Sequence, residues 1–291
     1  MSTSNINNLN DFPDEVLQNI FIRLNGNCIC KNIILVCKRW RDIVENNYFW
    51  ITKSELEKKN IEKATRYFQN FETLVAKKLY FKNPFERNLI KNPCGNDGFK
   101  DWCLTETQGD AQPIDLKDYY LKNKYNTIDA IDWSKEWPIQ KNGWSIESED
   151  VGCKPLNNEN ESIKRFVTSY YPAIKFQLID LEEEGLTKDM IKNSTIRIRF
   201  SENFTNRNFC GLRYQLCVRL LNEKYEKIKE FVYNQEIDRS DDSEWHTVVD
   251  EFKISRENLR FIYYYHKGSD NIFWAGYYGA KITNSSVQLF F

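Results

Sequence analysis

The sequence predicts an α+β protein: an N-terminal helical unit, a helical connector and a C-terminal antiparallel β-sandwich. Apolar residues recur at helical spacing near the N-terminus, and apolar and polar residues alternate along several segments of the second half. With 291 residues, of which 41% are hydrophobic and 15% aromatic, the chain can form one large or two modest domains. The expected organisation is a disordered tail at 1–10, a helical unit at 11–52, a connector at 53–79 and a β-domain at 80–291.

The first helical unit begins near Pro13, a residue that suits a first helical turn, with Asp11 as a candidate cap. The segment Asn25-Gly26-Asn27 is expected to end the first helix. The helical spacing gives this helix one apolar face. This face consists of Val16, Leu17, Ile20, Phe21 and Leu24.

A second apolar helix is expected to begin at Ile33 and to continue through Trp40, with Trp50 closing the unit. A segment of about 40 residues is near the lower size limit for forming a core alone. Burial of one Leu or Phe is worth roughly 1.5–3 kcal/mol, so an exposed apolar face would be costly. The pattern therefore predicts a partner protein that covers the face; the alternative is packing on the rest of the same chain.

Residues 51–80 carry an apolar stripe with charged residues between, which predicts a stiff helical connector. After Tyr80 the composition changes to turn signals and short apolar segments. Short strands are expected at Phe99–Leu104 and Gly143–Ile146. Residues 108–141 are polar and irregular, which predicts an inserted surface loop attached through its tryptophans.

The second half predicts regularly spaced strands that pair as an antiparallel sandwich. A single helical turn is expected at Thr187–Lys192. Along 196–200 and 212–220 the apolar and polar residues alternate, which gives each strand one buried and one wet face. The expected strands lie at 176–181, 196–200, 212–220, 228–233, 245–252, 259–265 and 280–290.

Charge and cysteine content exclude several functions. The formal net charge of −1 argues against nucleic acid as a partner. No basic-then-apolar N-terminus and no apolar run of 18 residues occurs, so we expect neither a signal peptide nor a membrane span, and a cytoplasmic location. The eight cysteines have apolar neighbours typical of reduced thiols, and Cys28-x-Cys30 lacks a second pair of ligands. We expect no metal and no cofactor.

Catalytic residues are not expected either. A glycosidase needs two carboxylates that flank the scissile bond, but Glu182–Glu184 and Asp241–Asp242 have the pattern of solvated turns. The chain has only two His, which leaves little basis for a Ser-His or Cys-His site. One of them, His266, is expected to stabilise a turn together with Asp270.

The N-terminal residues resemble an F-box. The resemblance lies in Phe12-Pro13, Glu15-Val16-Leu17, Ile20-Phe21, Leu24, Val36-Cys37-Lys38-Arg39-Trp40 and Trp50, with Phe12 in place of the usual Leu. It implies docking on the Skp adaptor of a cullin ubiquitin ligase. The expected adaptor-binding residues are Pro13, Leu17, Ile20, Phe21, Leu24, Val36, Cys37, Trp40 and Trp50.

Residues 83–290 resemble the F-box-associated (FBA) domain of the glycoprotein-recognising F-box proteins. The resemblance is carried by Asn88–Gly95, Trp102, Gly143-Trp144, Gln177–Leu181, Cys210-Gly211, Val218–Leu221, His266–Asp270, Phe273–Gly276 and Thr283–Val287. It implies a jelly-roll sandwich of galactose-binding type. It also implies the role of substrate receptor in a Skp-cullin-F-box (SCF) ubiquitin ligase, which does no bond chemistry itself. The best-studied family members bind the chitobiose core of high-mannose N-glycans on misfolded glycoproteins, a step in ER-associated degradation (ERAD).

The resemblance places the sugar site on Tyr170, Phe273 and Trp274. Ala275 stands where the family has Lys, and Phe273 replaces a Tyr, so two polar groups that orient the ligand are lost. The aromatic faces remain for stacking on sugars. Adjacent aromatics cannot both face one core in a strand, and Gly268 and Gly276 on either side favour a turn. Two alternatives stay open: Trp274 packs beneath the 108–141 insertion, or the receptor binds a protein surface instead of a glycan.

Overall fold

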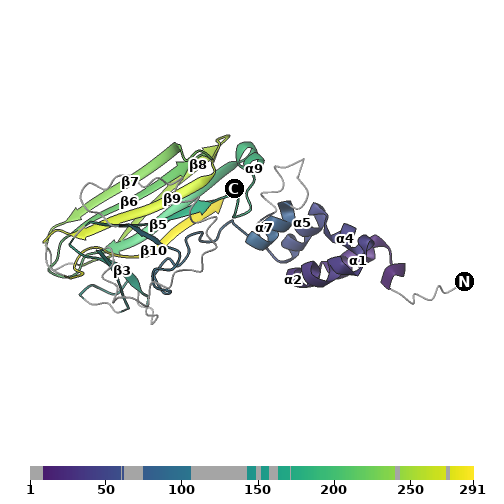
Figure 1. The fold of residues 1–291 in the computed structure, drawn as a ribbon, viewed down its shortest axis with the longest axis horizontal. Helices are drawn as coiled ribbons and strands as arrows, with labels where there is room; N and C mark the ends of the chain where they lie inside the picture. Colours follow the sequence, from purple (N-terminus) through teal and green to yellow (C-terminus); the bar gives the residue numbers. More distant parts are fainter. Residues whose placement is uncertain are drawn as a thin grey trace, which may run out of the picture.

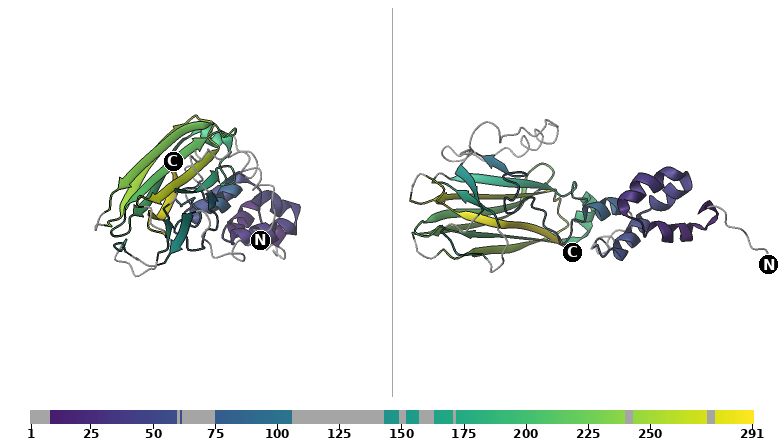
Figure 2. Two further views of the ribbon diagram at one scale, coloured as in Figure 1. Left: turned by 60° about the vertical axis from the view of Figure 1, so that its left-hand side comes forward. Right: turned by 90° about the horizontal axis from the view of Figure 1, so that it is seen from below.

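The computed structural model describes residues 9–59, 61, 75–105, 143–148, 152–156, 163–170, 172–239, 243–272 and 276–291. A group of helices lies at one end of an elongated molecule and a β-sandwich at the other (Figure 1). The view from below in Figure 2 shows the same order, with α7 between the two parts. The predicted insertion at 108–141 and most of the connector lie outside the described residues.

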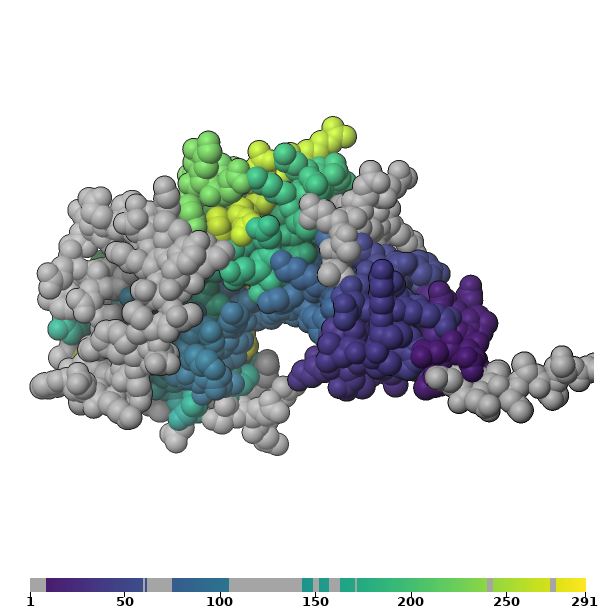
Figure 3. All heavy atoms as spheres, turned by 45° about the vertical axis from the view of Figure 1, so that its right-hand side comes forward, coloured from purple at the N-terminus to yellow at the C-terminus, as the bar shows by residue number. Residues whose placement is uncertain are grey.

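The helical unit consists of short helices. They are η1 (Leu9–Asp11), α1 (Asp14–Phe21), α2 (Gly26–Cys28), the π-helical turn η2 (Ile29–Ile33), α3 (Ile34–Val36), α4 (Lys38–Val44), α5 (Asn47–Leu56) and α7 (Val75–Lys82). In the space-filling view of Figure 3 this unit lies beside the sandwich, with α7 and the residues after it between them.

Three local predictions for this unit were wrong. Pro13, not Asp11, occupies the cap position of α1, and no side chain bonds there. Asn25 begins a helix rather than ending one, because its side chain accepts a hydrogen bond of 2.9 Å from the Asn27 N–H. The expected second helix is interrupted at Cys37, whose extended backbone (φ −159°, ψ 167°) separates α3 from α4.

The sandwich has two five-stranded sheets in the described residues, ordered β1-β4-β9-β6-β7 and β2-β3-β10-β5-β8, and every strand pair is antiparallel. The α+β class and the antiparallel sandwich are therefore confirmed. The strands are β1 (Cys103–Thr105), β2 (Trp144–Glu147), β3 (Arg165–Thr168), β4 (Ala173–Asp180), β5 (Thr195–Thr205), β6 (Leu212–Leu221), β7 (Lys227–Ile237), β8 (His246–Ser255), β9 (Phe261–Asp270) and β10 (Lys281–Phe290). The helical turn is α9 (Lys188–Asn193), capped by Thr187.

Two strand predictions need correction. β3 was missed, because its four residues are all buried and show no alternation that would mark them as a strand. The strand expected at Phe99–Leu104 begins only at Cys103, because Phe99 lies in a series of turns.

Helix α7 contacts both the helical unit and the sandwich. On one side the Tyr80 hydroxyl donates to Glu57 Oε2 at 2.7 Å. The Tyr80 ring also packs closely on Gly26, since a Cβ atom at residue 26 would lie only 2.6 Å from it. On the other side Leu79 packs beside Gly185. The residues after α7 then run along β10, with Glu86 N–H donating to the Leu289 carbonyl at 2.9 Å. Through these contacts, α7 and the residues that follow it connect the helical unit to the sandwich.

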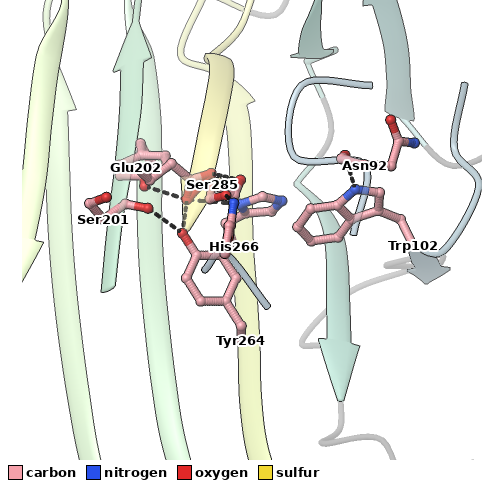
Figure 4. A network of polar contacts seen from close by, with 9 residues as sticks. Asn92, Trp102, Ser201, Glu202, Tyr264, His266 and Ser285 are labelled. Carbon is pink, nitrogen blue, oxygen red and sulfur yellow. Dashed lines mark hydrogen bonds and ion pairs between the residues drawn. The ribbon is translucent and has the colours of Figure 1, made fainter. Parts of the chain in front are cut away.

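The space between the two sheets contains a polar cluster around Glu202 (Figure 4). Glu202 is fully buried and accepts hydrogen bonds from His266 Nδ1 at 2.6 Å and from the hydroxyl groups of Tyr214, Tyr264 and Ser285 at 3.0–3.1 Å. Burial acts to raise the Glu202 pKa, but these partners outweigh it and hold the pKa below its usual value. Burial lowers the pKa of His266 to about 4.

The prediction that His266 and Asp270 together stabilise a turn was wrong for His266. His266 lies inside β9, fully buried, and stacks on Trp102 with ring centroids 5.1 Å apart. Gly268 is also in β9, where a Cβ would be 2.9 Å from the Thr168 side chain, so it allows close packing rather than a turn. Only Asp270 acts as expected, because its Oδ1 accepts from the Ile272 N–H at 3.0 Å.

Candidate functional site

The nine expected adaptor-binding residues of the helical unit differ in burial. Four of them form its interior, with at most 7% of each side chain exposed: Leu17, Phe21, Trp40 and Trp50. Phe21 packs on Trp40 with ring centroids 4.8 Å apart, and Trp50 Nε1 donates to the Val44 carbonyl at 2.8 Å. These residues shape the surface from below rather than forming it.

The exposed residues among the expected adaptor-binding set lie on α1, just before it and on α3. Ile20 is 40% exposed and Val36 is 55% exposed, and Pro13 is also exposed. Leu24 and Cys37 are half-buried. Val16 and Leu35 were not predicted to bind the adaptor, although they are 37% and 70% exposed. The sequence contained a signal for both residues. Val16 lies four residues before Ile20, and so on the same helix face, and Leu35 is next to Val36.

A buried lysine holds this unit together. The Lys53 side chain is 1% exposed and donates from Nζ to the carbonyls of Ile22 and Leu24 at 3.0 and 2.6 Å. It also pairs with Glu57 at 2.7 Å. The end of α1 and helix α5 are therefore linked through one ammonium group, which positions the exposed face of α1.

The loops at the far end of the sandwich form the second candidate surface. Tyr170 follows β3 and is half-buried. Its neighbour Ser169 accepts a hydrogen bond of 2.9 Å from the Asp270 N–H, which places Tyr170 beside the loop that follows β9. Phe273, Trp274 and Ala275 come next in the sequence after Ile272 and lie outside the described residues. The end of β9 and the start of β10 lie away from the helical unit (Figure 1).

The structure adds Phe209 to this end of the molecule. Phe209 lies in the turn between β5 and β6, is 53% exposed and has a left-handed backbone (φ 62°), which is unfavourable for a bulky residue. Its neighbour Gly211 packs directly against Asn271, at the start of the loop that carries Phe273 and Trp274. The signal for Phe209 in the sequence is weak, because this single aromatic residue directly follows the polar segment 206–208.

Polar contacts hold the turn that presents Phe209. Asn206 Nδ2 donates to the Cys210 carbonyl at 3.0 Å, and the Asn208 N–H donates to the Gly152 carbonyl at 2.6 Å. Arg207 pairs with Glu147 at 2.6 Å, and the other oxygen of Glu147 accepts from the buried Lys281 at 2.6 Å. The turn, β2 and the start of β10 are thus connected through one carboxylate.

This arrangement is that of a two-part protein with one candidate binding surface at each end. Among the described residues no group of three or more His, Cys, Asp or Glu could hold a metal ion. Within the same part of the chain no helix has the length and apolarity needed to cross a membrane.

Comparison with known proteins identifies the family. A family model described as F-box associated region matches residues 80–289, and one described as F-box-like matches residues 9–54. The chain belongs to the F-box proteins that carry an F-box-associated region. Both matched regions are binding domains, so the chain is a substrate receptor rather than an enzyme.

Its relatives share this organisation over nearly the whole length. The chain is 29% identical over 289 residues to F-box only protein 44 of Homo sapiens, covering 98% of this chain and 97% of that protein. It is 27% identical to F-box only protein 2 of Bos taurus, with 96% and 83% covered. Among solved structures, the family 16 carbohydrate-binding module 2 matches with 13% identity and a TM-score of 0.35, covering 70% of this chain and 100% of the module. That likeness is too distant to support an argument about ligands.

Proposed function

We propose that this chain is the substrate-recognition subunit of a Skp-cullin-F-box ubiquitin ligase in the cytoplasm, and that it captures N-glycans of misfolded glycoproteins for ERAD. The F-box end docks on the Skp adaptor, and the loops at the far end of the sandwich bind the target. Such tethering raises the effective concentration of target lysines near the ubiquitin donor. The observation that carries the proposal is that the two candidate surfaces lie at opposite ends, joined through α7 (Figure 1).

The adaptor surface is tested best with exposed residues. Leu17 and Trp40 are buried, so charged substitutions there would unfold the unit as well as prevent docking. Ile20→Asp and Leu35→Asp change exposed side chains, and we expect each to abolish co-purification with the Skp adaptor. Leu56→Asp is the matched control, because Leu56 is 58% exposed on α5 outside the predicted surface. Equal adaptor recovery with all three variants would contradict the proposed docking.

The glycan proposal rests on aromatic residues at the sandwich end. Tyr170 lies there, and the FBA resemblance adds Phe273 and Trp274 to the same loops. Aromatic faces stack on the apolar faces of sugar rings. We expect the full chain to bind chitobiose and high-mannose glycans on an array, and Trp274→Ala to remove this binding. Phe81→Ala, which alters a 42% exposed aromatic on α7, should bind like the unaltered chain.

The second candidate is a receptor for a non-glycan protein target. Ala275 favours it, because the Lys that the family has at this position would donate hydrogen bonds to a sugar. A chain that binds no glycan on the array but retains the Skp adaptor would support this candidate and reject the glycan proposal.

A further inference from the structure

An open cavity of about 440 Å³ lies at the end of the sandwich nearest α7, opposite the loops that carry Tyr170 and Phe209. It is found where α9 ends, β5 begins and β8 ends, close to Phe291 (Figure 1). Phe291 itself packs on Phe85, three residues after α7. The cavity is lined by Lys192, Asn193, Ser194, Thr195, Arg197, Lys253, Ser255, Arg256 and Phe291.

The lining is strongly cationic. It includes four basic side chains, from Lys192, Arg197, Lys253 and Arg256, and no carboxylate side chain. The whole chain has a formal charge of −1, so this concentration of positive charge is local. A cavity lined by one sign of charge concentrates ions of the opposite sign.

Two of these cations face each other at a cost to stability. Arg197 and Lys253 are direct cross-strand partners in the β5–β8 pair, and both are exposed on its outer face. Like charges directly opposite each other destabilise an antiparallel pair. Within the described part of the chain, Arg197 forms one ion pair, a long contact of 3.5 Å with Glu251. Among the described residues, no ion pair forms at Lys253 or Arg256, so their charges are not neutralised within the fold.

The number of unneutralised charges indicates the kind of ligand. One carboxylate carries a single negative charge and would compensate only one of these cations. A phosphate monoester carries about −1.5 to −2 charges at pH 7 and three acceptor oxygens, which match several Lys and Arg donors at once. The hydroxyl groups of Thr195 and Ser255 add neutral donors to the lining.

We propose that this cavity binds a phosphate monoester dianion through Arg197, Lys253 and Arg256. The site is separate from the target-binding loops and from the F-box surface, so it goes beyond the receptor function. A phosphate bound there neutralises the Arg197–Lys253 pair and links α9, β5 and β8.

Calorimetric titration of the full chain tests the proposal with two probes, inorganic phosphate and a phosphoserine peptide. We expect saturable binding of both probes at pH 7.5, and binding of the phosphopeptide should weaken below about pH 6, where its dianion gains a proton. Lys253→Gln and Arg256→Gln should each weaken binding at least tenfold. Tighter binding of the phosphopeptide than of inorganic phosphate would identify a protein-borne phosphate, and equal binding would identify a small phosphate compound.

Lys100→Gln provides the matched control, because Lys100 is an exposed lysine that lies outside the cavity lining, on the turn before β1. Its phosphate binding should equal that of the unaltered chain. In the absence of phosphate, Lys253→Gln should unfold at the same or a higher temperature, because it relieves the repulsion with Arg197. Absence of saturable binding, or an equal loss in Lys100→Gln, would overturn the proposal.

Discussion

The helical unit buries Lys53 and the sandwich buries Lys175, and the two parts accommodate these two lysines in opposite ways. Lys53 in the helical unit donates to two carbonyls and pairs with Glu57. Lys175 in the sandwich is fully buried, and its Nζ has no hydrogen-bond partner among the residues that the structure describes. Nζ lies 3.4 Å from the centroid of the Trp102 ring and 3.6 Å from that of the Phe166 ring. Burial lowers the pKa of Lys175 well below its usual value, although Glu202 opposes the shift.

The difference follows from which backbone groups each part leaves unpaired. Short helices expose carbonyls at their ends, and in a unit this small an ammonium group can reach several of them. In the sandwich the strand carbonyls pair in the ladders between strands, and Lys175 contacts aromatic faces instead. We therefore expect the helical unit to depend on Lys53 for its stability and the sandwich to tolerate Lys175.

The largest expected effect is that of Lys53→Met. The substitution leaves the Ile22 and Leu24 carbonyls without their donor, and each buried unsatisfied group costs about 1–3 kcal/mol. We expect the helical unit to lose about 2–4 kcal/mol of unfolding free energy. Hydrogen exchange of the α1 and α5 amides would measure the loss. Unchanged protection there would show that the lysine does not hold the unit together.

As the pH falls, the sandwich should lose unfolding free energy at a higher pH than the helical unit. Because the pKa of His266 falls from 6.5 to about 4 on folding, the unfolded chain binds this proton first, and stability falls as the pH drops from 6.5 toward 4. The loss reaches about 3 kcal/mol at most. Both histidines belong to the sandwich, so the helical unit has no such dependence.

Denaturant titrations at pH 7 and pH 4.5, followed by sandwich tryptophan fluorescence, would measure this effect. His266→Gln should flatten the dependence between these two pH values. His246→Gln, at an exposed position of β8, is the matched control and should keep the profile of the unaltered chain. A profile that is flat in the unaltered chain would contradict the assignment.

Lys175→Met should change stability little or raise it. Replacement of a buried charge by an apolar side chain of similar size is often neutral or stabilising. We expect the sandwich to gain about 1 kcal/mol, measured by the denaturation midpoint. A loss of several kcal/mol would mean that Lys175 supports Glu202 as strongly as Lys53 supports the carbonyls in the helical unit.

The smallest expected effect is that of Tyr80→Phe, which removes only the hydroxyl group bonded to Glu57. The ring stays against Gly26 and Trp50, so packing is kept. We expect a loss of about 1 kcal/mol from the helical unit by thermal unfolding. A larger loss would show that α7 depends on this hydrogen bond for its position.

Much of the fold could be predicted from periodicity. The strands β5 and β6 followed from alternation, and the burial along β5 alternates clearly between the core and solvent. The four-residue β3 was missed because it is buried on both faces. His266 was assigned to a turn because its neighbours Gly268 and Asp270 are common turn residues. Only the pairing of β9 with β4 and β6 places it in a strand.

The candidate sites show the same limit. The motif residues Leu17, Phe21, Trp40 and Trp50 were found from the sequence, but their burial was not, because periodicity gives a face and not which part of that face is covered. Phe209 and the Arg197–Lys253 pair were not found, since an exposed turn residue and a cross-strand partner depend on contacts between distant segments.

The sequence by itself determined the two-part organisation, the class of each part and the family, because local spacing sets helix or strand and the motifs are contiguous. Only the tertiary structure decided which apolar side chains reach solvent, where the charges of Glu202 and Lys281 are compensated, and that four cations meet at one cavity. These depend on strand register and on the packing of the two sheets, which bring together residues up to more than a hundred positions apart.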